Sequence, residues 1–121
     1  MKRLIVLALS VLLLGMTGLS VEPANAARGS ISVPDGVYGG TTTARVNPGG
    51  DAIWVYAECF QDDVLVYAQY VETDANNQAV LSLGPTPSWT GGPASCTAEE
   101  GYFNRSGRWH TVADTTFEVS G

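Results

Sequence analysis

The chain of 121 residues is acidic and carries little charge: 15% of its residues are charged, the formal net charge is −6, and there is one histidine. An acidic protein lacks the basic surface that binds nucleic acids or anionic membranes, so we expect no nucleic acid partner. Metal sites built from several imidazoles, including blue-copper sites, need more than one histidine and are excluded.

The first 26 residues have the pattern of a secretory signal peptide. Lys2 and Arg3 precede an apolar core, and Ala24-Asn25-Ala26 provides a small-x-small cleavage site. The alternative is a retained membrane anchor, but the apolar core is short for a bilayer. Cleavage after residue 26 would leave 27–121 as one small domain with four arginines, eleven carboxylates and a formal charge of −7. We therefore expect a protein secreted to the extracellular space, with no membrane insertion after cleavage.

From Ala27 onward, short segments rich in β-branched and aromatic residues alternate with Gly, Pro, Asn and Asp, and no helical periodicity is present. A long connection rich in proline and glycine, 84–93, precedes the sixth segment. The predicted strands are 30–33, 41–46, 52–60, 64–72, 78–83, 94–103 and 109–119. About seven strands at nearly regular spacing predict an all-β fold, an antiparallel β-sandwich.

The segments 52–60 and 64–72, joined by Gln61-Asp62-Asp63, predict a central hairpin. Strand alternation separates two sets of side chains in its first strand. One face carries Ile53, Val55, Ala57 and Cys59, and the other carries Trp54, Tyr56, Glu58 and Phe60.

The two cysteines of the chain, Cys59 and Cys96, predict one disulfide in an exported protein. A loop of this size would stabilise the fold by about 4 kcal/mol in the chain-entropy model. Whether the bond joins neighbours within one sheet or crosses between two sheets stays open at this point.

Three motifs resemble those of bacterial secreted immunoglobulin-like domains: Val46 to Gly50 leading into a strand, Thr73 to Leu81 as a hairpin end and a strand, and the closing Thr115 to Val119. The resemblance spans most of 27–121 and implies an immunoglobulin-like sandwich. A weaker similarity is to the neocarzinostatin-like chromophore-binding apoproteins, which are also small, acidic and exported. That family has two disulfides, whereas this chain has only the two cysteines named above.

Aromatic residues provide the candidate binding surface. If Cys59 faces the core, Trp54 and Tyr56 point outward, and Tyr67 on the neighbouring strand is expected to join them. Exposed rings on a sheet stack on sugars or anchor protein partners. The alternative is that a loop or the N-terminal strand covers them. Of the other tryptophans, Trp89 is expected to close one end of the core, and alternation predicts that Trp109 faces inward.

The polar residues do not predict catalysis. His110 and Asp114 lie four residues apart on one strand, about 13 Å, which is too far for a hydrogen bond. Asp62-Asp63 and Glu99-Glu100 are neighbours, and adjacent strand residues point to opposite faces. The oxygen-bearing side chains of 74–78 are explained by turn formation as well as by a calcium site. We expect no catalytic residue, no metal and no cofactor.

These observations predict an exported, non-enzymatic immunoglobulin-like module with a structural or recognition role and an unknown protein or glycan partner. The alternative is a small-molecule or carbohydrate-binding module that uses Trp54, Tyr56 and Tyr67. A small hydrolase is the third possibility and has the least support, because a sandwich of this size has little room for a substrate cleft.

Overall fold

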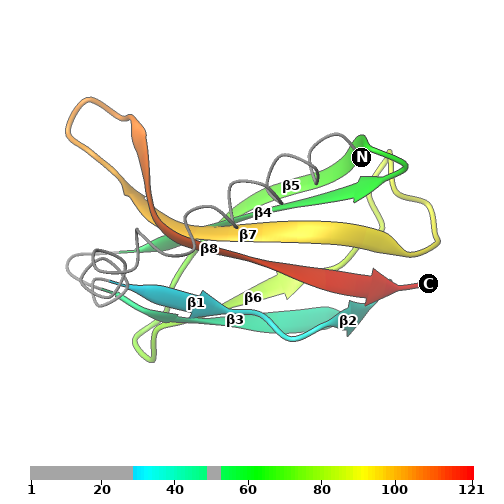
Figure 1. The fold of residues 1–121 in the computed structure, drawn as a ribbon, viewed down its shortest axis with the longest axis horizontal. Coiled ribbons are helices and arrows are strands. Elements are labelled where there is room, and N and C mark those ends of the chain that lie inside the picture. Colours follow the sequence, from blue (N-terminus) through cyan, green and yellow to red (C-terminus); the bar gives the residue numbers. More distant parts are fainter. Residues whose placement is uncertain (1–28, 49–52) are drawn as a thin grey trace, which may run out of the picture.

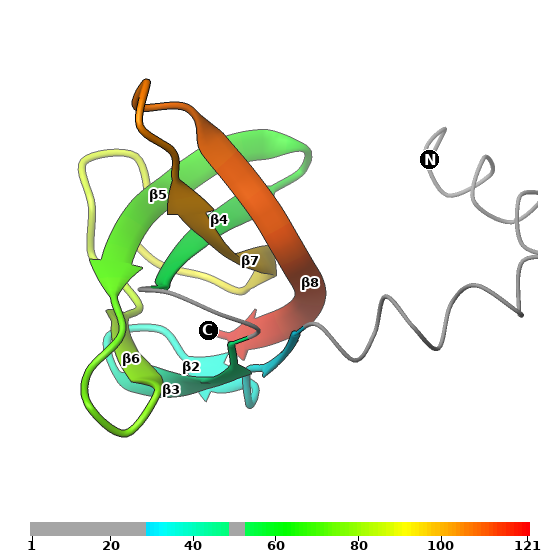
Figure 2. The ribbon, with the colours of Figure 1, turned by 90° about the vertical axis from the view of Figure 1, so that its left-hand side faces the viewer.

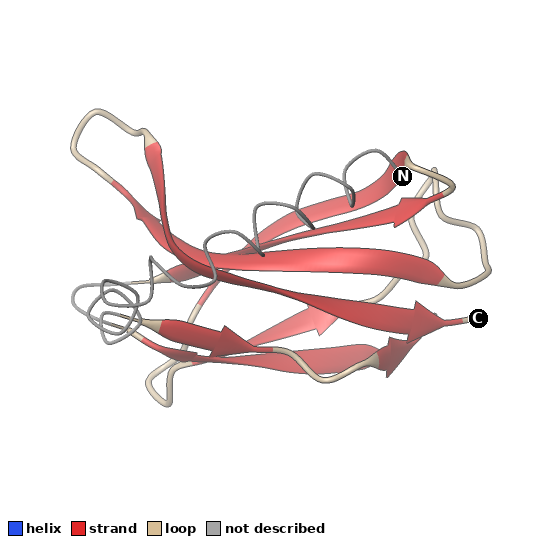
Figure 3. Ribbon diagram, in the orientation of Figure 1, coloured by secondary structure: helices blue, strands red, loops and turns tan. Residues whose placement is uncertain are grey.

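The computed structural model describes residues 29–48 and 53–121. These residues form strands and connecting turns without a helix (Figure 3), and the predicted signal peptide lies outside them. No helix in this part of the chain is long and apolar enough to cross a membrane. The strands are β1 (Ser30–Ser32), β2 (Gly36–Val37), β3 (Thr41–Asn47), β4 (Trp54–Gln61), β5 (Val64–Glu72), β6 (Gln78–Ser82), β7 (Ala94–Phe103) and β8 (Trp109–Ser120).

The strands form two sheets, of order β1-β3-β6 and β2-β8-β7-β4-β5, and the sheets face each other as two layers (Figures 1 and 2). All pairings are antiparallel except that of the two-residue β2 with β8. Each of the seven predicted segments contains a strand, so the predicted β-sandwich is confirmed. Placing β3 and β6 in one sheet and β4, β7 and β8 in the other is the strand arrangement of an immunoglobulin-like sandwich.

The core lies between the sheets and follows the predicted alternation of β4. Val55, Ala57 and Cys59 are fully buried, whereas Trp54, Tyr56 and Glu58 between them are only partly buried. Burial of one face of each sheet supplies most of the free energy that holds the domain together. Other large side chains of the core include Leu81, Leu83, Trp89, Phe117 and Val119.

The predicted disulfide joins Cys59 to Cys96. The two residues are direct neighbours on β4 and β7, so the bond lies within one sheet and does not cross the sandwich. Both cysteines are buried, and they are 37 positions apart in the sequence. The loop is long enough for a stabilisation of about 4 kcal/mol in the chain-entropy model.

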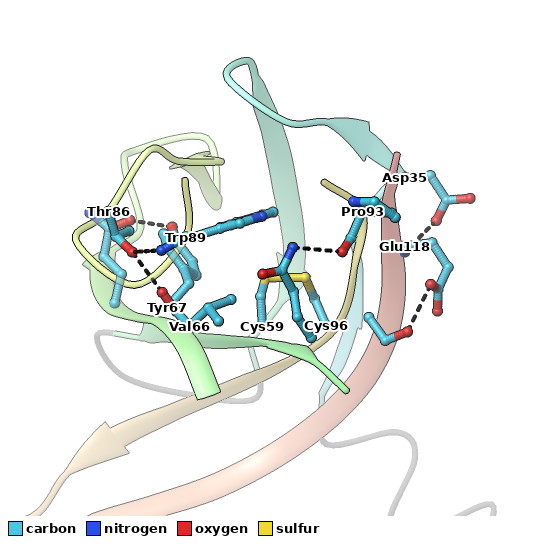
Figure 4. The surroundings of a disulfide bond; sticks show 12 residues. Asp35, Cys59, Val66, Tyr67, Thr86, Trp89, Pro93, Cys96 and Glu118 are labelled. Atoms are coloured by element: carbon cyan, nitrogen blue, oxygen red, sulfur yellow. Dashed lines mark hydrogen bonds between the residues drawn. A yellow bond between two sulfur atoms is a disulfide. The ribbon is translucent and has the colours of Figure 1, made fainter. Parts of the chain in front are cut away.

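Trp89 closes one end of the core, as predicted, and is 0% exposed. Its amide donates to Thr86 Oγ1 at 2.9 Å (Figure 4). Its indole Nε1 donates to the Gly92 carbonyl at 3.0 Å. The rings of Tyr38 and Tyr67 lie against it, with centroids at 5.2 and 5.9 Å. The connection between β6 and β7 therefore packs a large side chain and satisfies its polar atoms.

Candidate binding surface

Five aromatic rings gather on the solvent-facing side of the five-stranded sheet, and we call this group the aromatic surface. The strand register brings them together, because Tyr56 is opposite Tyr70 and Phe103 is opposite Trp109. Trp54 is opposite Gly101, which lies two residues before Phe103 on the same face of β7. The members are Trp54, Tyr56, Tyr70, Phe103 and Trp109.

The rings of the aromatic surface form one contiguous cluster. Tyr70 is in its middle, with centroids at 4.3 Å from Tyr56, 5.2 Å from Trp109 and 5.3 Å from Phe103. Phe103 in turn contacts Trp109 at 5.1 Å and Trp54 at 5.8 Å. Tyr70 and Phe103 remain 44% and 41% exposed. The other three rings are partly buried, so the cluster as a whole is a candidate binding surface.

Trp109 reaches this face because the pairing of β7 with β8 shifts between Glu100 and Gly101. The shift leaves one extra residue on β8, which reverses the alternation, so the prediction that Trp109 faces inward is wrong. Gly101 makes the arrangement possible. A Cβ there would lie 2.7 Å from the Trp109 ring and 2.2 Å from the His110 carbonyl oxygen. The missing side chain lets the indole lie directly over β7.

Tyr67 does not belong to the aromatic surface, and that prediction is wrong. A second register shift, between Cys59 and Phe60, places Tyr67 opposite Cys59 on the core face. Its side chain is 7% exposed and packs on Trp89, its hydroxyl donates to the Gln69 side chain, and burial raises its pKa to about 12. Without the shift, Tyr67 would pair with Glu58 and point outward. Tyr70 occupies the outward position instead.

The polar tips of two rings are held by carboxylates. Trp109 Nε1 donates to Glu99 Oε1 at 2.8 Å, and the Tyr56 hydroxyl donates to Glu58 Oε2 at 2.5 Å. The pKa of Tyr56 is raised, first by burial and then by this bond to Glu58. The hydrogen-bonding groups of these two side chains therefore have partners within the domain.

The strands that carry the aromatic surface contain several carboxylates, whereas two arginines, Arg105 and Arg108, lie in the turn between Phe103 and Trp109. No lysine or arginine occurs in the strands of the five-stranded sheet. Beside the rings, a hollow of about 740 Å³ lies over β4, β7 and β8, with Glu58 and Glu118 in its lining. Glu58 thus contacts both regions. The residues with a carboxylate at outward positions of this sheet are Glu58, Glu72, Glu99, Asp114 and Glu118.

The residues considered for catalysis lie apart from each other or have a local structural role. His110 is exposed and stacks on Tyr102 at 5.3 Å, whereas Asp114 is opposite Glu99 farther along β8. Asp62-Asp63 forms the two-residue β4–β5 turn, with φ values of 51° and 68°. Within residues 29–48 and 53–121, no group of three or more His, Cys, Asp or Glu side chains is placed to hold a metal ion.

The turn at 74–78 also has a local role. Asp74 Oδ1 accepts from the Asn76 amide at 2.8 Å and from the Gln78 amide at 3.1 Å. These bonds close the β5–β6 turn, as expected for an aspartate that accepts bonds from the amides that follow it.

Glu100 is a buried acid that sequence reasoning missed. It is 0% exposed, and neither carboxylate oxygen has a hydrogen-bond partner in the described part of the chain. Burial raises its pKa to about 7. Gly29 lies against it, because a Cβ on Gly29 would be 2.9 Å from Glu100 Oε2. Glu99 points outward and Glu100 inward, which confirms that this acid pair faces opposite sides of the sheet.

Comparison with known proteins adds little to this description. No family model matches the chain, and no curated protein matches it. Among solved structures, the chain is similar to the CARDB domain of a Pyrococcus furiosus protein, crystallised in complex with di-metal ions. The two share 18% identity over 76% of this chain and 88% of that chain, with a TM-score of 0.35. At this TM-score the likeness carries no argument about function.

Proposed function

We propose that this protein is an exported, non-enzymatic recognition module of the immunoglobulin-like type, which binds its ligand at the aromatic surface. One observation carries the proposal: five rings in mutual contact lie on the solvent side of the larger sheet, with Tyr70 and Phe103 more than 40% exposed. Burying such rings against a partner removes apolar surface from contact with water, which is the main driving force of association.

Two further features support the proposal. The buried disulfide is typical of proteins that function in an oxidising compartment, in agreement with export. His110 is on the protruding β7–β8 hairpin (Figure 1), next to Trp109 in sequence but on the opposite face of β8, where it stacks on Tyr102. Its ring therefore faces away from the side on which the aromatic rings would bind.

The proposal is tested by NMR titration of the ¹⁵N-labelled protein with a panel of glycans, apolar small molecules and short peptides. We expect amide shifts to concentrate on β4, β5 and the β7–β8 hairpin. Tyr70→Ala should weaken binding about fivefold, the equivalent of about 1 kcal/mol for one ring contact.

Tyr102→Ala is the matched control. Tyr102 is 41% exposed, close to the 44% of Tyr70, but it stacks on His110 and takes no part in the ring cluster. Equal losses in the two variants would contradict the proposal. A panel that produces no shift at the aromatic surface would contradict it as well.

A further inference from the structure

The charge around the aromatic surface narrows the class of ligand. We propose that the partner is an extended protein segment rich in arginine and lysine, an inference that rests on the proposed function. Five carboxylate residues occupy outward positions of the same sheet, and its strands contain no basic residue. A cationic side chain placed there would meet ring faces and carboxylates together, and both attract it.

The arrangement of the rings opposes two other ligand classes. Trp109 is inclined by 70° to Tyr70 and by 61° to Phe103, so these three rings do not form one flat platform for an extended sugar chain, and Tyr56 and Tyr70, inclined by 33°, are the pair closest to parallel. Their centroids are 5.1 to 5.3 Å apart. Rings this close touch one another and leave no room to enclose a quaternary ammonium group between them. The ligand therefore lies across the surface and not inside it.

The extent of the outward carboxylates across the sheet indicates that the partner contributes several basic side chains and not one. The hollow lined by Glu58 and Glu118 has a volume of about 740 Å³ and continues from the aromatic surface through the bond between Tyr56 and Glu58. Tyr70 on β5 and Glu118 on β8 are three strand spacings apart, about 14 Å, and are also offset by four residues along the strands, about 13 Å, because Tyr70 is level with Tyr56 and Glu118 with Phe60. A ligand that reaches both therefore spans about 19 Å, which about six extended residues cover. An alternation of basic and small residues would place cations at both ends.

The experiment uses a short peptide of alternating arginine and glycine as the probe, followed by tryptophan fluorescence and amide shifts. We expect shifts on the aromatic surface and around the hollow, and a binding constant that falls several-fold as salt is raised to about 0.5 M. Glu58→Gln combined with Glu118→Gln should weaken binding about fivefold, as two exposed ion pairs would. Glutamine keeps an oxygen that accepts the bonds from Tyr56 and Ser95.

Asp74→Asn is the matched control for the change in charge. Asp74 closes the β5–β6 turn, and the asparagine oxygen can accept the same two amide bonds. Because this turn is outside both the aromatic surface and the hollow, the variant should bind the arginine peptide as the unchanged protein does.

The other probes separate failure of this inference from failure of the proposed function. If a neutral oligosaccharide or tetramethylammonium binds at the aromatic surface, and the arginine peptide does not, the inference is wrong and the recognition surface stands. Equal binding of a glutamate-glycine peptide would also overturn the inference. If no probe shifts the aromatic surface, the proposed function itself is wrong.

Discussion

Two fully buried side chains toward opposite ends of the sandwich differ in whether their polar atoms have hydrogen-bond partners. Trp89, in the connection between β6 and β7, is 0% exposed, and its indole N–H, amide and carbonyl all have partners. Glu100, near the start of β1, is also 0% exposed, yet neither of its oxygens has a partner within the described residues. Figure 1 shows the two regions at opposite ends of the sheets.

The difference shows that burial alone does not decide whether a residue stabilises the fold. An apolar ring whose polar atoms are bonded contributes at every pH, since nothing in it titrates. A buried carboxyl group is tolerated while it is protonated and becomes costly when it ionises. The Trp89 end should therefore set the stability of the domain, and the Glu100 end should set its dependence on pH.

Trp89→Ala is expected to have the largest effect. Loss of a fully buried indole, which contacts the rings of Tyr38 and Tyr67, should lower the free energy of unfolding by about 4 kcal/mol. Urea unfolding followed by circular dichroism measures the loss, which should be the same at pH 5 and pH 8. Trp89→Phe keeps most of the apolar volume and should lose less than half as much. A loss below about 1 kcal/mol for the alanine variant would show that this end of the core can collapse around the gap.

Glu100→Gln tests the other end. Burial raises the pKa of Glu100 from 4.5 to about 7, so the folded state retains a proton that the unfolded state has released at intermediate pH. Stability linked to this group is complete below about pH 4.5, declines as pH rises, and is lost by about pH 7, at a cost of about 3 kcal/mol. Glutamine mimics the protonated acid. The variant should match the unchanged protein near pH 4.5 and exceed it by that amount above pH 7.

The measurement for Glu100→Gln is urea unfolding of both proteins across this pH range. The difference between the two curves isolates Glu100 from the other carboxylates, because those are common to both proteins. Two parallel curves would mean that Glu100 does not change protonation on unfolding, and the contrast between the two ends would then disappear.

Strand alternation predicted the core of the central hairpin, because β4 buries one face and Val55, Ala57 and Cys59 follow strictly in period two. It failed wherever a register shift inserted a residue. The shift at Cys59 and Phe60 turned Tyr67 inward and Tyr70 outward, so a ring central to the aromatic surface was missed. A one-residue slip reverses every later side chain, and nothing in the hydrophobic pattern alone marks it.

Two features of the sequence could have indicated the register shifts. A glycine inside a strand, such as Gly101, often marks a bulge or a close approach of another group, and here it marks both. The two-residue turn Asp62-Asp63 sets the pairing of β4 with β5 next to the turn, with Gln61 opposite Val64. Continued without a shift, that pairing would place Tyr67 opposite Glu58, so the inward position of Tyr67 requires a bulge. The burial of Glu100 had no sequence signal, since a glutamate on a strand is ordinarily solvated.

The smallest expected effect is that of Tyr38→Phe at the Trp89 end. The Tyr38 hydroxyl donates to the Trp89 carbonyl at 3.0 Å, and phenylalanine would keep the ring contact at 5.2 Å while losing that bond. The carbonyl would not be left alone, because the Thr86 amide also donates to it, at 3.1 Å. The loss should therefore be about 1 kcal/mol or less in urea unfolding, and equal at pH 5 and pH 8. A loss of several kcal/mol would mean that the Thr86 amide does not satisfy the Trp89 carbonyl without Tyr38, and that the polar atoms at this end of the core are less well bonded than the structure indicates.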